Sequence, residues 1–400
     1  MSGGLLFLIL AIVTITAYVA GRRRATTSVG GDTRDLHSST NYHGLATGTG
    51  ALIAGIATFV LLQFLSTVAP VFANPWLVTI VSVALAATAF LFVYARITPA
   101  FRARNLFEAM VVGILILASL IAIFTTIAIV LSLVSESVRF FGQYGWVRFF
   151  FGTVWSPSFQ GDSQLGMLPL LWGTLYVSFI ALLVAVPVGL FSAIYLTQYA
   201  SARFRKVVKP VIEVLAGIPT IVYGLFALIT VGPILRDYFA EPTGLGSSSA
   251  SVMTAGLVMG VMLIPFVSSL SDDIINAVPR AMRDGSLGLG ATQSETIRRV
   301  ILPAALPGIV GAILLAASRA IGETMIVVLG AGAAARLSLN PLEAMTTVTV
   351  KIVSQLTGDT DFTSPETLVA FALGITLFVL TLGMNVLALY IVRRFREQYE

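Results

Sequence analysis

Nine apolar blocks separated by short polar segments dominate the pattern of hydrophobic and polar positions along the chain. They cover residues 4–20, 50–70, 76–94, 108–133, 169–194, 209–232, 252–270, 304–330 and 367–392. A helix needs about 20 apolar residues to cross the hydrocarbon core of a bilayer, and the blocks are close to this length or longer. The pattern therefore predicts an all-α polytopic membrane protein with nine spans.

Composition and charge agree with this prediction. Hydrophobic residues make up 57% of the 400 residues and charged residues 11%, whereas soluble globular domains have roughly 25% charged residues. The net charge of +5 does not indicate a nucleic-acid partner, because the basic residues lie in short clusters at span ends rather than on one continuous face. We expect membrane lipid around the protein and no nucleic acid bound to it.

The sequence offers few residues for thiol or metal chemistry. It has no Cys, which excludes disulfides, thiol catalysis and Cys-ligated zinc. Its two His residues, His37 and His43, lie in a polar segment. We expect no metal site.

The basic clusters predict the orientation of the spans. Arg22 to Arg24 directly follow the first block, which places the N-terminus outside, and every other basic cluster then falls on the inner side of an alternating nine-span path. Arg203, Arg205, Lys206 and Lys209 mark one of the inner turns. These clusters are interpreted as topology signals.

Residues 1–95 are predicted to form a three-span accessory unit with a cytosolic linker at 21–48. The linker is rich in Thr, Ser and Gly and has no apolar periodicity, so we expect little fixed structure in it. The three spans hold almost no ionisable residue, which favours anchoring or subunit packing over a substrate path.

The longest charged segment of the C-terminal half, Asp272 to Pro307, predicts two short helices joined by a turn on the cytoplasmic side. Pro279 suits a first helical position, and Gly290 suits a helix end. Thr292 and Glu295 have the spacing of a capping box that opens the next helix.

This segment resembles the EAA loop of ABC importer permeases. The pattern of that loop is E-A-A-x-x-x-G, followed by a spacer of nine residues and then by I-x-L-P. Here Asp284-Gly285-Ser286 replaces Glu-Ala-Ala, while Gly290 and Leu302-Pro303 keep the spacing. The resemblance implies a six-span MetI-like permease domain at 105–400, with a coupling loop at 272–303 that seats in a cytoplasmic ATPase. The coupling residues it implies are Arg280, Asp284, Gly285, Ser286, Gly290 and Pro303.

Other segments resemble the phosphate-specific importer, PstC type. They are Glu213 to Thr220, Leu302 to Ile309, Arg319 to Met325 and Met345 to Val350. The resemblance implies a permease subunit that imports inorganic phosphate through the bacterial inner (cytoplasmic) membrane. It also implies a second permease subunit (PstA-type), a dimeric cytoplasmic ATPase (PstB-type) and a periplasmic phosphate-binding protein (PstS-type).

ATP hydrolysis is expected in a separate subunit, because the sequence has no G-x-x-x-x-G-K-[ST] nucleotide-binding loop. The chain itself is therefore expected to be no enzyme and to bind no cofactor directly, with ATP used by the partner ATPase.

Two pairs of residues are candidates for the transport path. Arg319 and Glu323 lie four residues apart, on one face of the eighth predicted span, and form either a structural ion pair or a transient phosphate contact. Glu213 and Pro219 open the sixth predicted span, where Pro219 predicts a kink. For Glu213, gating and a simple snorkelling or capping role both stay open.

Three other functions are alternatives to phosphate import. A secondary transporter would show two related halves with broken helices and several intramembrane acids, but the EAA-like loop occurs once and the acids are few. An integral-membrane enzyme would need a cluster of His, Asp or Glu at the interface, and the sequence has none. A permease for another oxyanion or small solute stays open.

Overall fold

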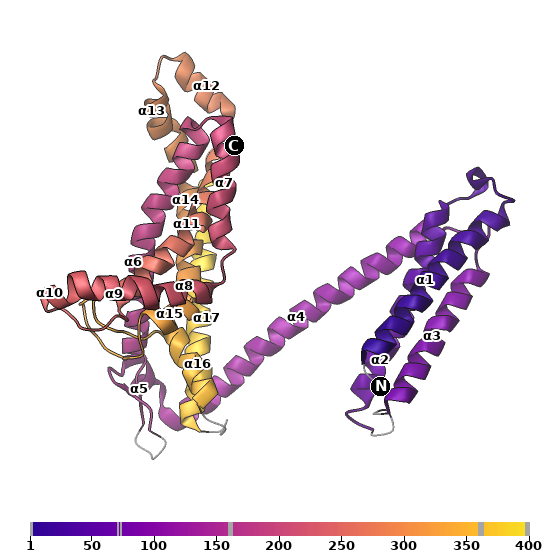
Figure 1. The fold of residues 1–400 in the computed structure, drawn as a ribbon, viewed down its shortest axis with the longest axis horizontal. Coiled ribbons are helices and arrows are strands. Elements are labelled where there is room, and N and C mark those ends of the chain that lie inside the picture. The colour runs from indigo at the N-terminus through magenta and orange to yellow at the C-terminus, as the bar shows by residue number, and fades with distance from the viewer. Residues whose placement is uncertain (1–2, 70–71, 73, 159–162, 359–363, 397–400) are drawn as a thin grey trace. The chain divides into compact units, whose positions relative to one another are not determined.

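The computed structural model describes residues 3–69, 72, 74–158, 163–358 and 364–396 (Figure 1). The chain divides into two compact units, Met1–Ile127 and Ala128–Glu400. The division falls inside one long helix, later than the predicted gap between 1–95 and 105–400. Those predicted domain boundaries stay a prediction.

The first unit consists of helices that pack side by side (Figure 1). Its elements are α1 (Gly3–Ser28), η1 (Thr33–Asp35), α2 (Thr40–Leu65), α3 (Pro75–Ala95) and the first part of α4 (Ala103–Tyr144).

Small residues bring α1 and α2 into close contact. A Cβ on Gly44 would lie 2.8 Å from the Tyr18 ring, and a Cβ on Gly55 would lie 2.6 Å from the Leu10 side chain. Between these positions Thr47 donates its hydroxyl to the Ala17 carbonyl at 2.9 Å. Glycine lets the two backbones approach each other, which increases the packing contacts that hold helices together in a bilayer.

The expectation of an unstructured linker at 21–48 is wrong for most of its length. Helix α1 continues to Ser28 and α2 begins at Thr40, so only 29–39 lies between them. His43 is fully buried in α2, with its ring 5.9 Å from that of Phe101. Three of the linker glycines, Gly21, Gly44 and Gly48, instead permit close packing of α1 on α2.

The second unit contains the rest of α4 and a helical bundle. Its further elements are α5 (Trp146–Phe151), β1 (Trp155–Ser156), β2 (Gln164–Leu165), α6 (Leu168–Ile194), η3 (Tyr195–Tyr199), α7 (Ala202–Ala216), α8 (Thr220–Phe226), η4 (Ala227–Val231), α9 (Gly232–Leu235), η5 (Arg236–Ala240), α10 (Glu241–Thr243), α11 (Val252–Ala277), α12 (Arg280–Gly288), α13 (Gln293–Thr296), η6 (Ile297–Ile301), α14 (Leu302–Ile321), α15 (Met325–Gly330), α16 (Val348–Gly358) and α17 (Pro365–Arg396). The strands β1 and β2 form a short antiparallel pair.

The core of this unit surrounds α11, which packs closely against α6 and α14. Met259 and Leu263 of α11 are fully buried, and Gly256 and Gly260 let the α6 side chains Ile180 and Val184 approach the α11 backbone. In Figure 1 the segment α8–α10 runs across the long helices, and α12 and α13 lie at one end of the bundle. The ATPase-facing loop predicted from the sequence is thus an extension of the most buried helix.

Nine helices in the described residues are long and apolar enough to cross a membrane, as the sequence predicts. Their bounds differ from those of the predicted blocks, most notably in the sixth and the eighth. The sixth covers Thr220–Thr243 rather than 209–232, because Val211 and Val214 lie exposed on the separate amphipathic helix α7. The eighth ends at Ile321 rather than at 330.

Candidate functional site

Helix α12 carries most of the predicted coupling residues. It begins after Pro279, which is the N-cap rather than the first helical residue, and ends at Gly288. Gly290 has φ +87°, a left-handed conformation that glycine adopts without steric cost, as the predicted turn requires. The predicted capping box of Thr292 and Glu295 is present, with both reciprocal hydrogen bonds formed. The turn at Gly290 and the capping box are thus confirmed, whereas Pro279 lies one position earlier than predicted.

The surface of α12 is open. No residue of the helix is buried, and Arg280, Asp284 and Gly285 are exposed. Ser286 instead faces α13, where its hydroxyl lies 2.9 Å from that of Thr296. Leu289, which follows the helix, is 91% exposed, and such a leucine is a candidate anchor for a partner surface.

Pro303 lies in the first turn of α14. The preceding turn, η6, is wide, and the Leu302 N–H donates to the Ile297 carbonyl five residues back. Ile301 and Leu302 already have helical backbone angles, so Pro303 lies inside a continuous helical run, Gln293–Ile321, and can donate no backbone hydrogen bond there. Pro303 therefore marks the change from the wide turn to α14.

The expected ion pair between Arg319 and Glu323 is not among the ion pairs of the described residues. Helix α14 ends at Ile321 with Gly322 as its C-cap, so the two residues do not share one helical face. The Glu323 carboxylate instead accepts the backbone N–H groups of Thr324 at 3.2 Å and Met325 at 3.1 Å, at the start of α15. A carboxylate close to free N–H groups at a helix start binds them, and this displaces the pairing that helical spacing suggested.

Arg319 and Glu323 nevertheless each make defined contacts around the break between α14 and α15. The Arg319 side chain is exposed and lies 5.8 Å from the ring centre of Phe266 on α11. Thr349 at the start of α16 donates its hydroxyl to the Glu323 carbonyl at 2.9 Å. Arg319 is thereby left without a carboxylate partner among the described residues, whereas Glu323 is tied to the backbone.

The predicted kink at Pro219 is a complete break between α7 and α8. Helix α7 ends at Ala216, and Pro219 is the N-cap of α8 with ψ 136°. The Tyr223 hydroxyl donates to the Leu215 carbonyl at 2.8 Å and so bridges the break. The exposed Glu213 precedes the break by one helical turn.

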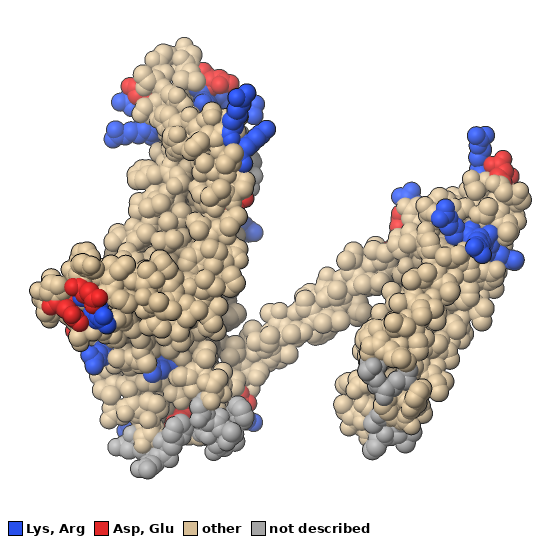
Figure 2. All heavy atoms as spheres, viewed as in Figure 1, with Lys and Arg blue, Asp and Glu red and all other residues tan. Residues whose placement is uncertain are grey.

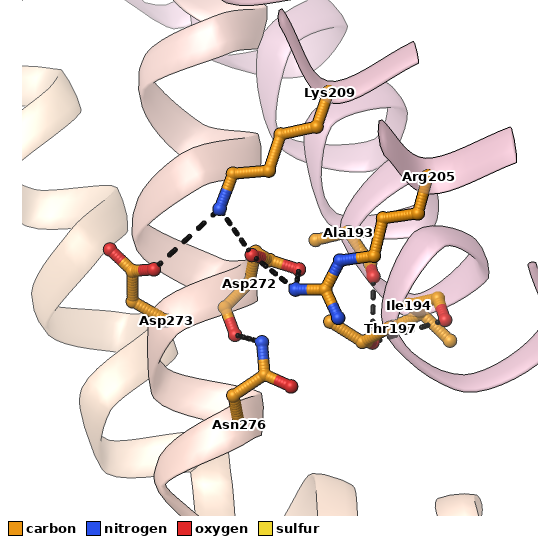
Figure 3. Close-up of polar contacts among 8 residues, drawn as sticks. All are labelled: Ala193, Ile194, Thr197, Arg205, Lys209, Asp272, Asp273 and Asn276. Atoms are coloured by element: carbon orange, nitrogen blue, oxygen red, sulfur yellow. Dashed lines mark hydrogen bonds and ion pairs between the residues drawn. The ribbon is translucent and has the colours of Figure 1, made fainter. Parts of the chain in front are cut away.

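A buried ionic cluster joins α7 to α11, and sequence reasoning missed it (Figure 3). The Asp272 side chain, only 4% exposed, accepts hydrogen bonds on both oxygens from Arg205 Nη2 at 2.9 Å. Lys209 Nζ donates to the same carboxylate at 2.7 Å and lies 3.9 Å from Asp273. We call Arg205, Lys209 and Asp272 the α7–α11 ion cluster.

The α7–α11 ion cluster explains why α7 stays on the bundle although none of its residues is buried. The hydrogen bond from Lys209 to Asp272 raises the pKa of the lysine above its ordinary value, so the cation is favoured. Glu213 and Lys209 also line a cavity of about 10 Å³ beside Asp272. The cluster lies one and a half turns before the end of α11, where the chain passes to α12.

Comparison with known proteins supplies independent observations. The family described as "Binding-protein-dependent transport system inner membrane component" matches residues 185–397, and "Phosphate ATP-binding cassette transporter" matches residues 6–75. These matches lie on parts of both compact units.

Relatives of the chain include three proteins that are 32–35% identical to it. A probable ABC transporter permease protein, YqgH, from Bacillus subtilis is 33% identical over 62% of this chain and 78% of its own length. The phosphate transport system permease protein PstC of Mesorhizobium japonicum is 32% identical over 66% of this chain and 84% of its own. PstC 1 of Mycobacterium tuberculosis is 35% identical over 62% and 82%.

Among solved structures, a bacterial alginate ABC transporter in complex with a pentasaccharide-bound periplasmic protein is 18% identical. The match covers 73% of this chain and 97% of that chain, with a TM-score of 0.48.

Proposed function

Because the chain belongs to the family of binding-protein-dependent transport system inner membrane components, we propose that it is the permease subunit of an ATP-driven importer of inorganic phosphate. The observation that carries the substrate is that two comparisons point to phosphate transporters. Residues 6–75 match a phosphate ATP-binding cassette transporter family, and relatives that match 62–66% of the chain include several named PstC.

The proposed coupling element is α12. The helix is exposed at one end of the bundle, and it continues from the buried helix α11 after a two-residue connection. Seating of α12 in a groove of a dimeric cytoplasmic ATPase (PstB-type) would pass the movement of that ATPase directly to α11. ATP hydrolysis belongs to that partner, and the chain itself binds no cofactor and catalyses no reaction in this proposal.

The proposed substrate contact is Arg319. Its guanidinium has no carboxylate partner among the described residues, and a planar guanidinium binds an oxyanion through two parallel hydrogen bonds. Glu323 holds the break that presents Arg319. Glu213 and Pro219, at the break between α7 and α8, are proposed to allow these helices to change their relative angle during the cycle.

The chain supplies one coupling loop and therefore half of the translocation path. A second permease subunit (PstA-type) completes the path in this proposal, and a periplasmic phosphate-binding protein (PstS-type) delivers the substrate. The assembly then resides in the bacterial inner membrane.

Uptake into proteoliposomes tests the proposal. The chain, its partner permease and the ATPase are reconstituted with the phosphate-binding protein, and ATP-dependent uptake of labelled phosphate is compared with that of labelled sulfate. We expect uptake of phosphate alone. Equal or greater uptake of sulfate, or uptake without ATP, would refute the proposed function.

A further inference from the structure

A groove in the first unit lies between α2, α3 and the start of α4. Its volume is about 370 Å³, within the range of about 300–1,000 Å³ that is usual for small-molecule sites. Its walls are apolar and include Ile53, Phe92, Leu106 and Met110, and Arg96 is the one charged residue of the lining. We propose that this groove binds one acyl chain of an anionic phospholipid, with the phosphate of its head group held by Arg96.

The length of α3 places the groove at a depth in the bilayer that suits a phospholipid. This helix has 21 residues, which correspond to about 31 Å, close to the thickness of the hydrocarbon core. Arg96 is the residue directly after the helix and therefore lies at the level of the lipid head groups. Ala89, also in the lining, lies seven residues earlier, so the groove extends about 10 Å into the apolar layer.

The charges around the groove favour an anionic head group. Arg96 has no carboxylate partner among the residues that the structure describes, and its guanidinium lies 4.0 Å from the ring centre of Phe92, a wall residue. Arg24 approaches the same end of α3, 5.5 Å from the Tyr94 ring. Figure 2 shows Lys and Arg side chains gathered at this end of the unit.

The nearest acidic residue of α4 does not offset this positive charge. Glu108 lies between Leu106 and Met110 in sequence, and residues two apart on a helix point to nearly opposite sides. Its carboxylate pairs with Arg104 at 2.6 Å. The groove therefore combines an apolar slot with an unpaired cation at its mouth, and this combination fits an anionic phospholipid better than a zwitterionic one.

Photocrosslinking of the full-length chain in its assembled transporter tests the inference. A photoreactive amino acid replaces Ile53 in the groove or, as the control, Ile80, which is 63% exposed on the same unit. The complex is placed in nanodiscs of equal phosphatidylglycerol and phosphatidylcholine, and mass spectrometry quantifies the two lipid adducts. We expect the ratio of phosphatidylglycerol to phosphatidylcholine to be about fivefold higher at position 53 than at position 80. This factor corresponds to the ~1 kcal/mol that one basic residue contributes near an anionic surface.

Arg96→Gln should lower the ratio at position 53 to that of the control, whereas Arg96→Lys should keep most of the preference. Size-exclusion chromatography establishes that each variant remains assembled. Equal ratios at positions 53 and 80, an unchanged ratio in Arg96→Gln, or adducts to protein in place of lipid at position 53 would each overturn the proposal.

Discussion

Replacement of Asp272 by Asn should release α7 from the bundle without changing the size of the side chain. The wild-type carboxylate is almost fully buried and contacts two cations whose side chains are 32% exposed. The amide keeps a similar shape but carries no charge, so Arg205 would lie against α11 without a counter-charge and Lys209 would keep only the exposed Asp273, at 3.9 Å.

The expected loss of stability follows from this geometry. At an effective dielectric constant of about 20, each contact of 2.7–2.9 Å has a gross attraction of about 6 kcal/mol, most of which desolvation offsets. Breaking a fully buried pair costs about 3–5 kcal/mol. Because water reaches both cations, we expect about 2–3 kcal/mol for Asp272→Asn.

Hydrogen–deuterium exchange measures this loss locally. Since no residue of α7 is buried, its amides should exchange through local opening, and the loss corresponds to exchange about 30- to 150-fold faster in α7. Amides of α6 should be unaffected. Asp273→Asn is the matched control, because the Asp273 side chain is 68% exposed and lies 3.9 Å from Lys209, so its effect should stay below about 1 kcal/mol. Exchange in α7 of Asp272→Asn within about twofold of the control would refute the reasoning.

The same cluster has a defined response to pH. Because the hydrogen bond to Asp272 raises the pKa of Lys209, the contribution of this lysine to stability is complete below its ordinary value of 10.5. It is lost as pH rises through the raised pKa. Protection of α7, corrected for intrinsic exchange, should thus be constant from neutral pH to 10.5 and fall only above it, and a fall between neutral pH and 10.5 would contradict this assignment.

Four further predictions concern other parts of the chain. Gly290→Val should abolish phosphate-stimulated ATP hydrolysis, because a β-branched residue at φ +87° costs about 1–3 kcal/mol, whereas Gly288→Val, at an equally open position without positive φ, should keep it. A variant lacking residues 1–94 should still copurify with its ATPase and take up phosphate; loss of uptake in an assembled variant would contradict this. Glu323→Ala should lower thermal stability by about 1–2 kcal/mol through loss of the α15 cap. The double variant Arg319→Glu with Glu323→Arg should not restore the phosphate uptake that the single variants lose, since the two residues form no ion pair. Recovery of uptake in the double variant would argue for such a pair.

The number of spans and the local structure of the α12–α13 segment could be predicted because each depends on local signals. Apolar length identifies a span, and the capping box of Thr292 and Glu295 depends on four consecutive residues. Gly290 was recognisable for the same reason, since a helix end followed by a turn favours glycine.

The ion cluster could not be predicted in this way. Asp272 lies 67 residues after Arg205 and 63 after Lys209, so their contact depends on how α7 packs against α11. A usable signal did exist: Arg205 and Lys209 are four residues apart and share a helical face, and Asp272 closes an apolar block. Interpreting the basic residues as topology signals alone concealed it.

Glycine is the other reason why the helix bounds predicted from the sequence differ from those in the structure. Gly322 lies in a block that looks like one continuous helix, yet α14 stops there and the chain restarts one turn later. Gly44 suggested a flexible linker but lies in a helix against the Tyr18 ring. The residue type is identical in both cases, and only the packing around it decides whether it ends a helix or joins two.

The close packing of α1 on α2 has a consequence for the order of events during synthesis. Its contacts extend from Leu10 to Gly55, so they need nothing from the chain beyond α2. At about 5–20 residues per second, the ribosome takes about 2–8 s to advance from Leu65 to Ala103, the start of α4. The first two helices therefore have seconds in which to pair as they leave the translocon, and the orientation of this pair is set before any helix of the permease core has been made.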